Sequence, residues 1–371
     1  MPFLSAVPWL TAPLFLFACS GSPKPTPAST PARGLRLVPA RTVTLKETDS
    51  LFIGSPSAVW LGKEGSFFVA DRLHPKIAQV DSTGAFVRIL SRPGPGPGEL
   101  EAPIQIVGLG DSAIGVADEV KRVVEIFSLP AGKFSRARPY DGSVTSAWVD
   151  GSIIWMGGVS PRHGRGVKRW DLGADSIDHL VSLPLSYQRN GPLAAFFYNV
   201  AVAPQGDNLI VGYSADRAIL VTDRHGTVVD SFAVPSAGRR GEPADLEQRI
   251  DPKNDMEFAD LVALSSVLVQ IGARADGSLL FVHLDYGMIP PRTITAKAFV
   301  SLVSADLTRA CVDAEVPQDD PGVMPFAFRG DTLFTVKQLA GAGRRVETSL
   351  VGYTVDSSNC DWLPVAHTKL H

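Results

Sequence analysis

The sequence has little charge, few cysteines and no apolar segment long enough to cross a bilayer comfortably. Charged residues make up 20% of the chain and its net charge is −3, so no basic excess is available to gather nucleic-acid phosphates. With 45% hydrophobic residues, this low charge also excludes a disordered chain or a coiled coil. Long amphipathic helical patterns are almost absent, whereas 34 glycines and 29 prolines are typical of short strands joined by turns. We therefore expect an all-β protein that binds no nucleic acid.

The N-terminus has the pattern of an export signal. The apolar run within residues 1–19 is shorter than the roughly 20 residues of a bilayer span. It ends in Leu16-Phe17-Ala18-Cys19, which resembles the bacterial lipobox, whose cysteine is lipidated and becomes the mature N-terminus. Residues 20–40 are rich in Pro, Ser and Thr, which favours an extended tether. We expect a lipid anchor on Cys19 at the outer membrane or the periplasmic face of the cell envelope; ordinary secretion is the alternative if the lipobox is not used.

A repeated β unit organises residues 41–371. Val-Ala-Asp triplets end at Asp71 and Asp118, 47 residues apart, and each belongs to a pattern of short strands and turns. Four short strands in a repeat of this length are typical of a β-propeller blade. The regular spacing of the expected strands predicts six four-stranded antiparallel blades, with an insertion at about 235–261. The early strand Arg41–Leu45 has no blade of its own, and we expect it to close the ring by joining the last blade, outside or beside Cys360–Pro364.

Two cysteines remain once Cys19 is assigned to the lipid. Cys311 and Cys360 form an even pair in an oxidising compartment, so a disulfide is one alternative. The blade pattern, however, puts them on the outer strands of neighbouring blades, which are usually too far apart for disulfide geometry. We therefore expect two free thiols.

The link between the first two blades carries a family resemblance. It reads Gly-Pro-Gly-Pro-Gly-Glu-Leu over residues 94–100, with Pro103 after it. Together with Phe67–Asp71, the strand Lys76–Asp81 and the turn at residues 83–86, it resembles the six-bladed β-propeller lipoproteins of the NHL-repeat kind. The family's asparagine after the blade aspartate is replaced in both blades, by His74-Pro75 and Val120-Lys121. The resemblance implies a scaffold that binds proteins, peptides or glycans and, in a minority of relatives, carries lyase or lactonase chemistry.

The repeated aspartates are weak candidates for a binding site. Asp71 and Asp118, with Asp216 and Asp285 near equivalent strand ends, would offer oxygen ligands to a cation at one mouth of the channel. The structural alternative is that each carboxylate accepts backbone N–H groups at its own blade corner, and recurrence from blade to blade favours this interpretation. His283 is two residues before Asp285 on the same side of a strand, which would bring both into the channel.

Basic residues provide the remaining candidates. Arg162 and Arg165 lie in a basic loop suited to an acidic partner. The histidines lack metal-ligand spacing, and the sequence has neither a Gly-x-Ser-x-Gly elbow nor a zinc-type cysteine pair. We therefore assign no catalytic residue, metal or cofactor.

These patterns together favour a non-catalytic binding or scaffold module. We expect a monomer that contacts the membrane through its lipid and binds a protein, peptide or glycan on one propeller face. The alternative is a metal-dependent, lactonase-like hydrolase or lyase with its site in the central channel.

Overall fold

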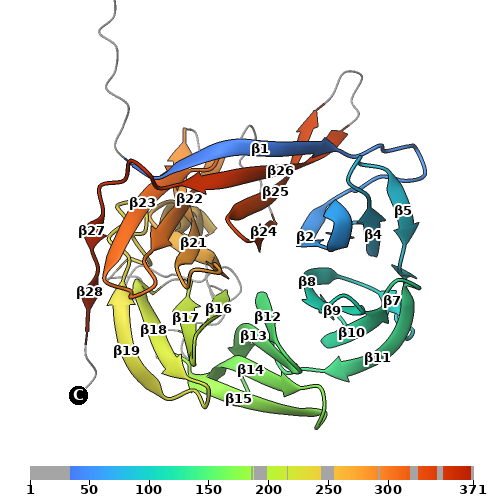
Figure 1. The fold of residues 1–371 in the computed structure, drawn as a ribbon, viewed down its shortest axis with the longest axis horizontal. Coiled ribbons are helices and arrows are strands. Elements are labelled where there is room, and N and C mark those ends of the chain that lie inside the picture. Colours follow the sequence, from blue (N-terminus) through green and yellow to red (C-terminus); the bar gives the residue numbers. More distant parts are fainter. Residues whose placement is uncertain are drawn as a thin grey trace, which may run out of the picture. The chain divides into compact units, whose positions relative to one another are not determined.

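Six antiparallel sheets, arranged as the blades of a ring, contain nearly all strands of the structure (Figure 1). The exceptions are β6 (Arg92–Pro93) and β7 (Glu99–Leu100), which form a short parallel pair in the link between the first two blades. The structure is a computed structural model, and it describes residues 34–184, 187, 199–214, 216–243, 255–290, 293–317, 325–340 and 346–368. Nearly all elements in these ranges are strands. The prediction of an all-β, six-bladed β-propeller is therefore confirmed.

Blades 1 to 3 each contain four strands that follow one another in sequence. Blade 1 has β2 (Pro56–Leu61), β3 (Phe67–Asp71), β4 (Lys76–Val80) and β5 (Phe86–Ile89). Blade 2 has β8 (Pro103–Leu109), β9 (Ala113–Asp118), β10 (Val123–Ser128) and β11 (Lys133–Pro139). Blade 3 has β12 (Ser146–Asp150), β13 (Ile153–Ser160), β14 (Arg165–Asp171) and β15 (Ser176–Ser182).

Blades 4 and 5 also use consecutive strands, and blade 6 contributes three of its own. Blade 4 has β16 (Val200–Gln205), β17 (Asn208–Tyr213), β18 (Ala218–Asp223) and β19 (Val228–Ala233). Blade 5 has β20 (Ser266–Ala273), β21 (Leu279–Ile289), β22 (Thr293–Val303) and β23 (Arg309–Glu315). Blade 6 has β24 (Phe326–Arg329), β25 (Thr332–Ala340) and β26 (Val346–Asp356). The insertion before blade 5 includes α4 (Asp255–Ala263).

Short polar turns set the strand boundaries. Between β4 and β5, the Asp81 carboxylate accepts hydrogen bonds from the N–H groups of Thr83 (2.8 Å) and Ala85 (3.0 Å). Gly84 completes this turn at φ 85°, a conformation that side-chain-bearing residues rarely adopt. The Asp-to-Gly spacing therefore favours a tight turn, which brings the third and fourth strands of the blade together as a hairpin.

The N-terminal strand closes the ring, as predicted. β1 (Arg36–Thr44) pairs antiparallel with β26 and becomes the outer strand of blade 6. The predicted boundary was wrong, because residues 36–40 belong to this strand and not to the tether. Pro39 is accommodated because β1 is an edge strand, where a missing N–H is tolerated, and a register shift occurs at Pro39/Arg41.

The C-terminal segment takes a different course from the predicted one. Cys360–Pro364 does not form an outer strand of blade 6, because β1 already holds that edge. Instead, β27 (Leu363–Pro364) pairs with β23 of blade 5, and β28 (Ala366–His367) pairs with β19 of blade 4. The chain end therefore runs across the outer edges of two further blades (Figure 1).

This course of the C-terminal segment also overturns the prediction of two free thiols. Cys311 and Cys360 form a disulfide, with Cα atoms 6.0 Å apart. The expected separation assumed that Cys360 lies in the outer strand of blade 6. Because Cys360 instead lies where the chain crosses blade 5, it comes within the Cα spacing that a disulfide with Cys311 on β23 requires.

The hydrophobic core lies between neighbouring blades. One layer joins blades 1 and 2 through Phe68, Ile77, Ile114, Val116 and Phe127, each at most 1% exposed. The link between these blades is folded by Glu99, which accepts a 2.9 Å hydrogen bond from the Gly96 N–H. The Gly-Pro-Gly-Pro-Gly-Glu segment is therefore a structural joint. No helix in the described ranges is long and apolar enough to cross a membrane.

Candidate functional site at the channel mouth

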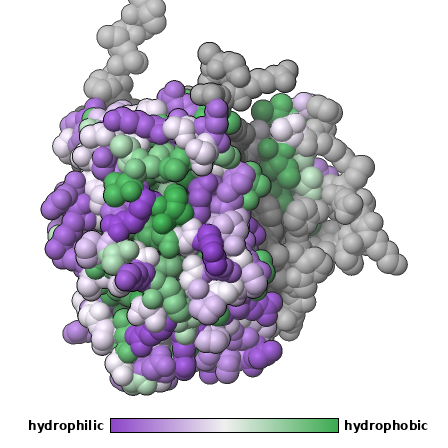
Figure 2. All heavy atoms as spheres, turned by 90° about the vertical axis from the view of Figure 1, so that its right-hand side faces the viewer, coloured by the Kyte–Doolittle hydropathy of each residue, from purple (hydrophilic) through white to green (hydrophobic). Residues whose placement is uncertain are grey.

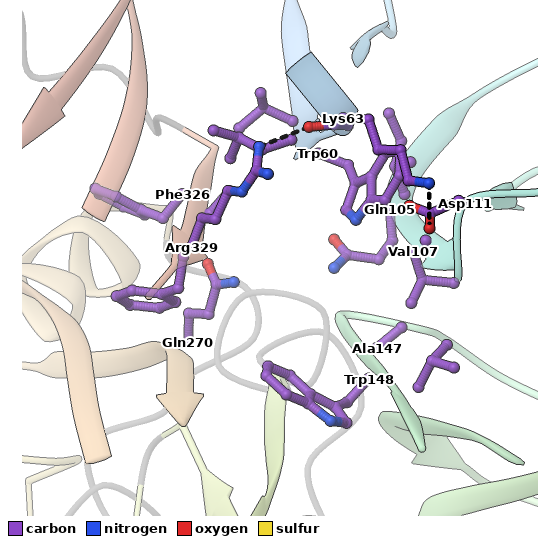
Figure 3. Close-up of a pocket in the computed structure, with 18 residues that line it drawn as sticks. Trp60, Lys63, Gln105, Val107, Asp111, Ala147, Trp148, Gln270, Phe326 and Arg329 are labelled. Atoms are coloured by element: carbon purple, nitrogen blue, oxygen red, sulfur yellow. Dashed lines mark hydrogen bonds and ion pairs between the residues drawn. The ribbon is translucent and has the colours of Figure 1, made fainter. Parts of the chain in front are cut away.

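The innermost strands surround a recess at one end of the ring (Figure 3). This channel-mouth recess has a volume of about 320 Å³ and receives residues from blades 1, 2, 3, 5 and 6. The residues that give it its chemical character are Trp60, Gln105, Trp148, Gln270, Phe328 and Arg329. A volume of this size is in the range of small-ligand pockets.

The recess opens at the end of each blade where the first strand turns into the second. Lys63 follows β2, Asp111 follows β8 and Arg329 ends β24. Because the strands are antiparallel, the connections between second and third strands lie at the opposite end. The two ends of the propeller therefore present separate sets of loops.

Glycine backbones make room for two of the aromatic rings. A Cβ atom added to Gly108 would lie 2.0 Å from Cζ2 of Trp60, so this indole rests directly against the β8 backbone. A Cβ added to Gly272 would lie 2.4 Å from Cδ2 of Phe328. Both glycines therefore position the aromatic wall of the recess, and replacing either with alanine requires a ring to move.

The charged groups of the recess are already paired within the protein. Lys63 of blade 1 and Asp111 of blade 2 form a 2.6 Å ion pair at the rim, with side chains 65% and 61% exposed. Arg329 donates a 2.6 Å hydrogen bond from Nη1 to the Gly62 carbonyl, which links blades 6 and 1. Figure 3 shows both contacts beside the opening. These interactions hold the rim together across blade boundaries.

The uncharged polar groups are arranged differently. The amides of Gln105 and Gln270 point into the recess from opposite sides, and neither forms a hydrogen bond with another described residue (Figure 3). The indole N–H groups of Trp60 and Trp148 likewise have no hydrogen-bond partner in the described part of the chain. Half-buried aromatic faces together with free amides can bind and orient a ligand.

In the part of the chain that the structure describes, the lining of the recess contains a single carboxylate. Asp111 is the carboxylate of the recess lining, and it is paired with Lys63. Across the described ranges, no three His, Cys, Asp or Glu side chains come together in a way that would hold a metal ion.

The repeated aspartates Asp71 and Asp118 lie at the opposite end and are fully buried. Asp118 accepts four backbone N–H groups at 2.7–3.1 Å, from Glu101, Ala102, Val120 and Lys121. Asp71 has the equivalent set of four, with the Lys76 ammonium at 3.1 Å in addition. Burial raises the pKa of Asp71, but these hydrogen bonds outweigh it and lower the pKa overall. Each carboxylate therefore connects the turn after the second strand of its blade to the segment that precedes the first strand of the same blade.

His283 and Asp285 lie on β21, the second strand of blade 5, and not on a channel-lining strand. His283 is 1% exposed, with Nε2 3.5 Å from the Ser236 hydroxyl, and burial lowers its pKa to about 3. Asp285 pairs with Arg240 at 2.6 Å. Both residues therefore contact the segment that leads from blade 4 to blade 5, so the expected place in the channel is not observed.

The remaining sequence candidates are dispersed. Asp216 follows β17, and its Oδ1 accepts a 3.0 Å hydrogen bond from the Ala218 N–H. Arg162 is 84% exposed and 3.7 Å from Asp141, and Arg165 donates to the Ser182 hydroxyl. Cys19 lies outside the described residues.

Sequence reasoning missed the recess because it followed the repeated aspartates to the other end of the blades. The signal was present in the first strands of three repeats, which contain Trp60, Trp148 and Phe328. Aromatic residues in these strands alternate with residues that pack between blades. Only the closed ring shows which of them line the recess and which belong to the hydrophobic core.

Comparisons with known proteins support the fold. No family model and no curated protein matches the chain. A member of the DUF4221 family from Bacteroides vulgatus has a TM-score of 0.59 at 12% identity, over 91% of this chain and 99% of that one. A protein of Bacteroides fragilis whose name describes it as exported has a TM-score of 0.57 at 13% identity, over 85% and 94% of the two chains. At these identities the likeness concerns the fold alone: the chain shares the six-bladed β-propeller architecture.

Proposed function

We propose that this chain is a non-catalytic binding module of the bacterial cell envelope, which takes its ligand at the channel-mouth recess. The observation that carries the proposal is the pairing pattern in the recess. Its charged groups are engaged within the protein, whereas the amides of Gln105 and Gln270 and the faces of Trp60 and Trp148 remain available. Rigid strands hold these groups, so little ordering is required when a protein, peptide or glycan binds.

Export and anchoring complete the proposal. The disulfide between Cys311 and Cys360 supports an oxidising compartment outside the cytoplasm. We place the lipid on Cys19, following the lipobox-like Leu16–Cys19, and relate the chain to the NHL-repeat kind through the link at residues 94–100. In this arrangement the protein acts as a monomer held at the membrane by its N-terminus. Replacing Cys19 with serine releases the protein from the membrane fraction on this proposal, and continued membrane association would contradict it.

Capture from a solubilised cell-envelope extract tests the binding role. The immobilised chain is expected to retain a protein, peptide or carbohydrate ligand that Trp60→Ala and Trp148→Ala fail to retain. Trp362→Ala provides the matched control, because Trp362 is half-buried in the C-terminal segment, where Arg309 lies over its ring. Equal retention by the wild type and by Trp60→Ala would refute binding at the recess.

A further inference from the structure

A second hollow adjoins the channel-mouth recess between blades 1 and 2. It has a volume of about 470 Å³, and its wall includes Phe68, Gln79, Val87 and Arg88. Trp60 and the Lys63–Asp111 ion pair line both hollows. The two hollows therefore adjoin at Trp60, and we refer to them together as the groove.

The outer end of this groove reaches β5, the last strand of blade 1. Val87 on β5 is 51% exposed and lines the second hollow. Figure 2 shows this side of the molecule, where apolar side chains (green) gather between polar ones (purple). An occupant of the groove can therefore extend beyond the recess and need not end within it.

The formal charges along the groove cancel. Its lining contains three basic and three acidic side chains, namely Lys63, Arg88, Arg329, Glu64, Asp81 and Asp111. Most of them are engaged within the protein: Arg88, for example, donates a 2.7 Å hydrogen bond from Nε to Gln79 Oε1. Lys63 pairs with Asp111, while Arg88 and Arg329 donate to the neutral oxygens of Gln79 and Gly62. With no net charge and most charged groups already hydrogen bonded, the lining offers little to offset the loss of hydration of a charged ligand. The groove therefore fits an uncharged occupant.

The free groups of the groove suit hydroxyl-bearing rings. An amide both donates and accepts hydrogen bonds, as a hydroxyl does, so Gln105 and Gln270 match sugar hydroxyl groups. The aromatic faces of Trp60 and Trp148 offer flat apolar surface to the C–H face of a pyranose ring. An extended peptide is less well matched, because its charged side chains and termini would lose hydration in a groove whose formal charges cancel and are mostly hydrogen bonded within the protein.

We propose that the groove binds a neutral oligosaccharide chain, one end of which lies in the channel-mouth recess while the chain crosses Trp60 into the second hollow. This inference rests on the proposed binding function and specifies its ligand class. It requires that affinity grow with chain length, because a short sugar fills one hollow and a longer one fills both.

Titration calorimetry of the full chain in detergent tests this, with neutral oligosaccharides of two to six units from glucans, xylans, mannans and chitin as probes. We expect binding of at least one series to tighten at least tenfold, by an order-of-magnitude estimate, once the chain is long enough to enter both hollows. Trp60→Ala is expected to abolish binding at every length. Gly108→Ala, which retains every functional group but displaces the Trp60 ring, is expected to do the same.

The second hollow has its own matched pair of variants. Val87→Ala is expected to weaken the longer probes roughly fivefold and leave the shortest binding probe unchanged. Val229→Ala is the control, because Val229 is equally exposed (52%, against 51% for Val87) on β19, the corresponding strand of blade 4.

The remaining outcomes contradict either the groove, the glycan ligand or the binding function itself. Binding that is independent of chain length, or insensitive to Val87→Ala, would overturn the two-hollow groove. If no neutral oligosaccharide binds while the extract still yields a Trp60-dependent peptide or protein ligand, the glycan inference fails and the binding function stands. If no ligand of any class depends on Trp60, both fail.

Discussion

We predict how much the disulfide between Cys311 and Cys360 contributes to the folding stability of the closed ring. The bond joins β23 of blade 5 to the segment that follows β26, across a sequence separation of 49 residues. The loop that it closes contains all three strands that blade 6 contributes from the C-terminal half of the chain. Reduction is therefore expected to remove the cross-link between β23 and the segment after β26, which leaves them joined through the backbone of blade 6 alone.

The magnitude follows from the loop length. For a closed loop of about 50 residues, the chain-entropy relation gives about 4 kcal/mol of stabilisation at 25 °C. With a denaturant slope of roughly 3 kcal/mol/M, reduction should lower the urea midpoint by about 1.3 M. The assay is urea unfolding of the oxidised and the reduced wild-type protein, followed by fluorescence and by circular dichroism to establish a single transition.

The double variant Cys311→Ala/Cys360→Ala is the control, since it has no bond to reduce. Its midpoint should be unaffected by reductant and should lie near that of the reduced wild type. Identical midpoints for oxidised and reduced wild type would refute the reasoning, because strand pairing by β1, β27 and β28 would then be sufficient to hold the ring. Limited proteolysis adds a local test, in which the chain beyond Asp356 should be cut first after reduction.

Three further outcomes are expected. Gly108→Ala should cost about 1–3 kcal/mol of folding stability and shift the tryptophan fluorescence, because the new Cβ displaces Trp60; unchanged spectra would contradict this packing. Asp118→Asn should destabilise the fold by about 3 kcal/mol, because an amide replaces a buried carboxylate that accepts four N–H groups; a stable variant with altered cation binding would instead support the metal interpretation. The hydrogen bond to the Leu307 carbonyl and the Asp230 carboxylate raise the pKa of His367, so its charged form adds stability that is fully present below about pH 6.5 and is lost as pH rises through the raised pKa. The urea midpoint of His367→Gln should therefore differ more from wild type at about pH 5.5 than at about pH 8.5, and a pH-independent difference would refute this assignment.

Much of the architecture can be predicted from the sequence because it depends on local residue patterns. The turn at Asp81–Gly84 specifies its own hairpin through side-chain acceptors and a glycine at positive φ. The recurrence of such units, together with the strand left over at the N-terminus, sufficed to predict six blades and closure by that strand. The turns and strands that make up this pattern each depend on residues within a few positions of one another, and the closure follows from the strand that the pattern leaves over.

The tertiary structure alone determined which blades the C-terminal segment pairs with and where the recess lies. Cys360 reaches Cys311 only because β1 occupies the edge of blade 6 and sends the C-terminal segment onto blade 5, a competition between residues at the two ends of the chain. The recess draws Trp60, Trp148 and Phe328 from three different blades, and Gly108 and Gly272 from two others determine where two of these rings lie. A repeat pattern describes one blade at a time, whereas the channel mouth exists only when the ring has closed.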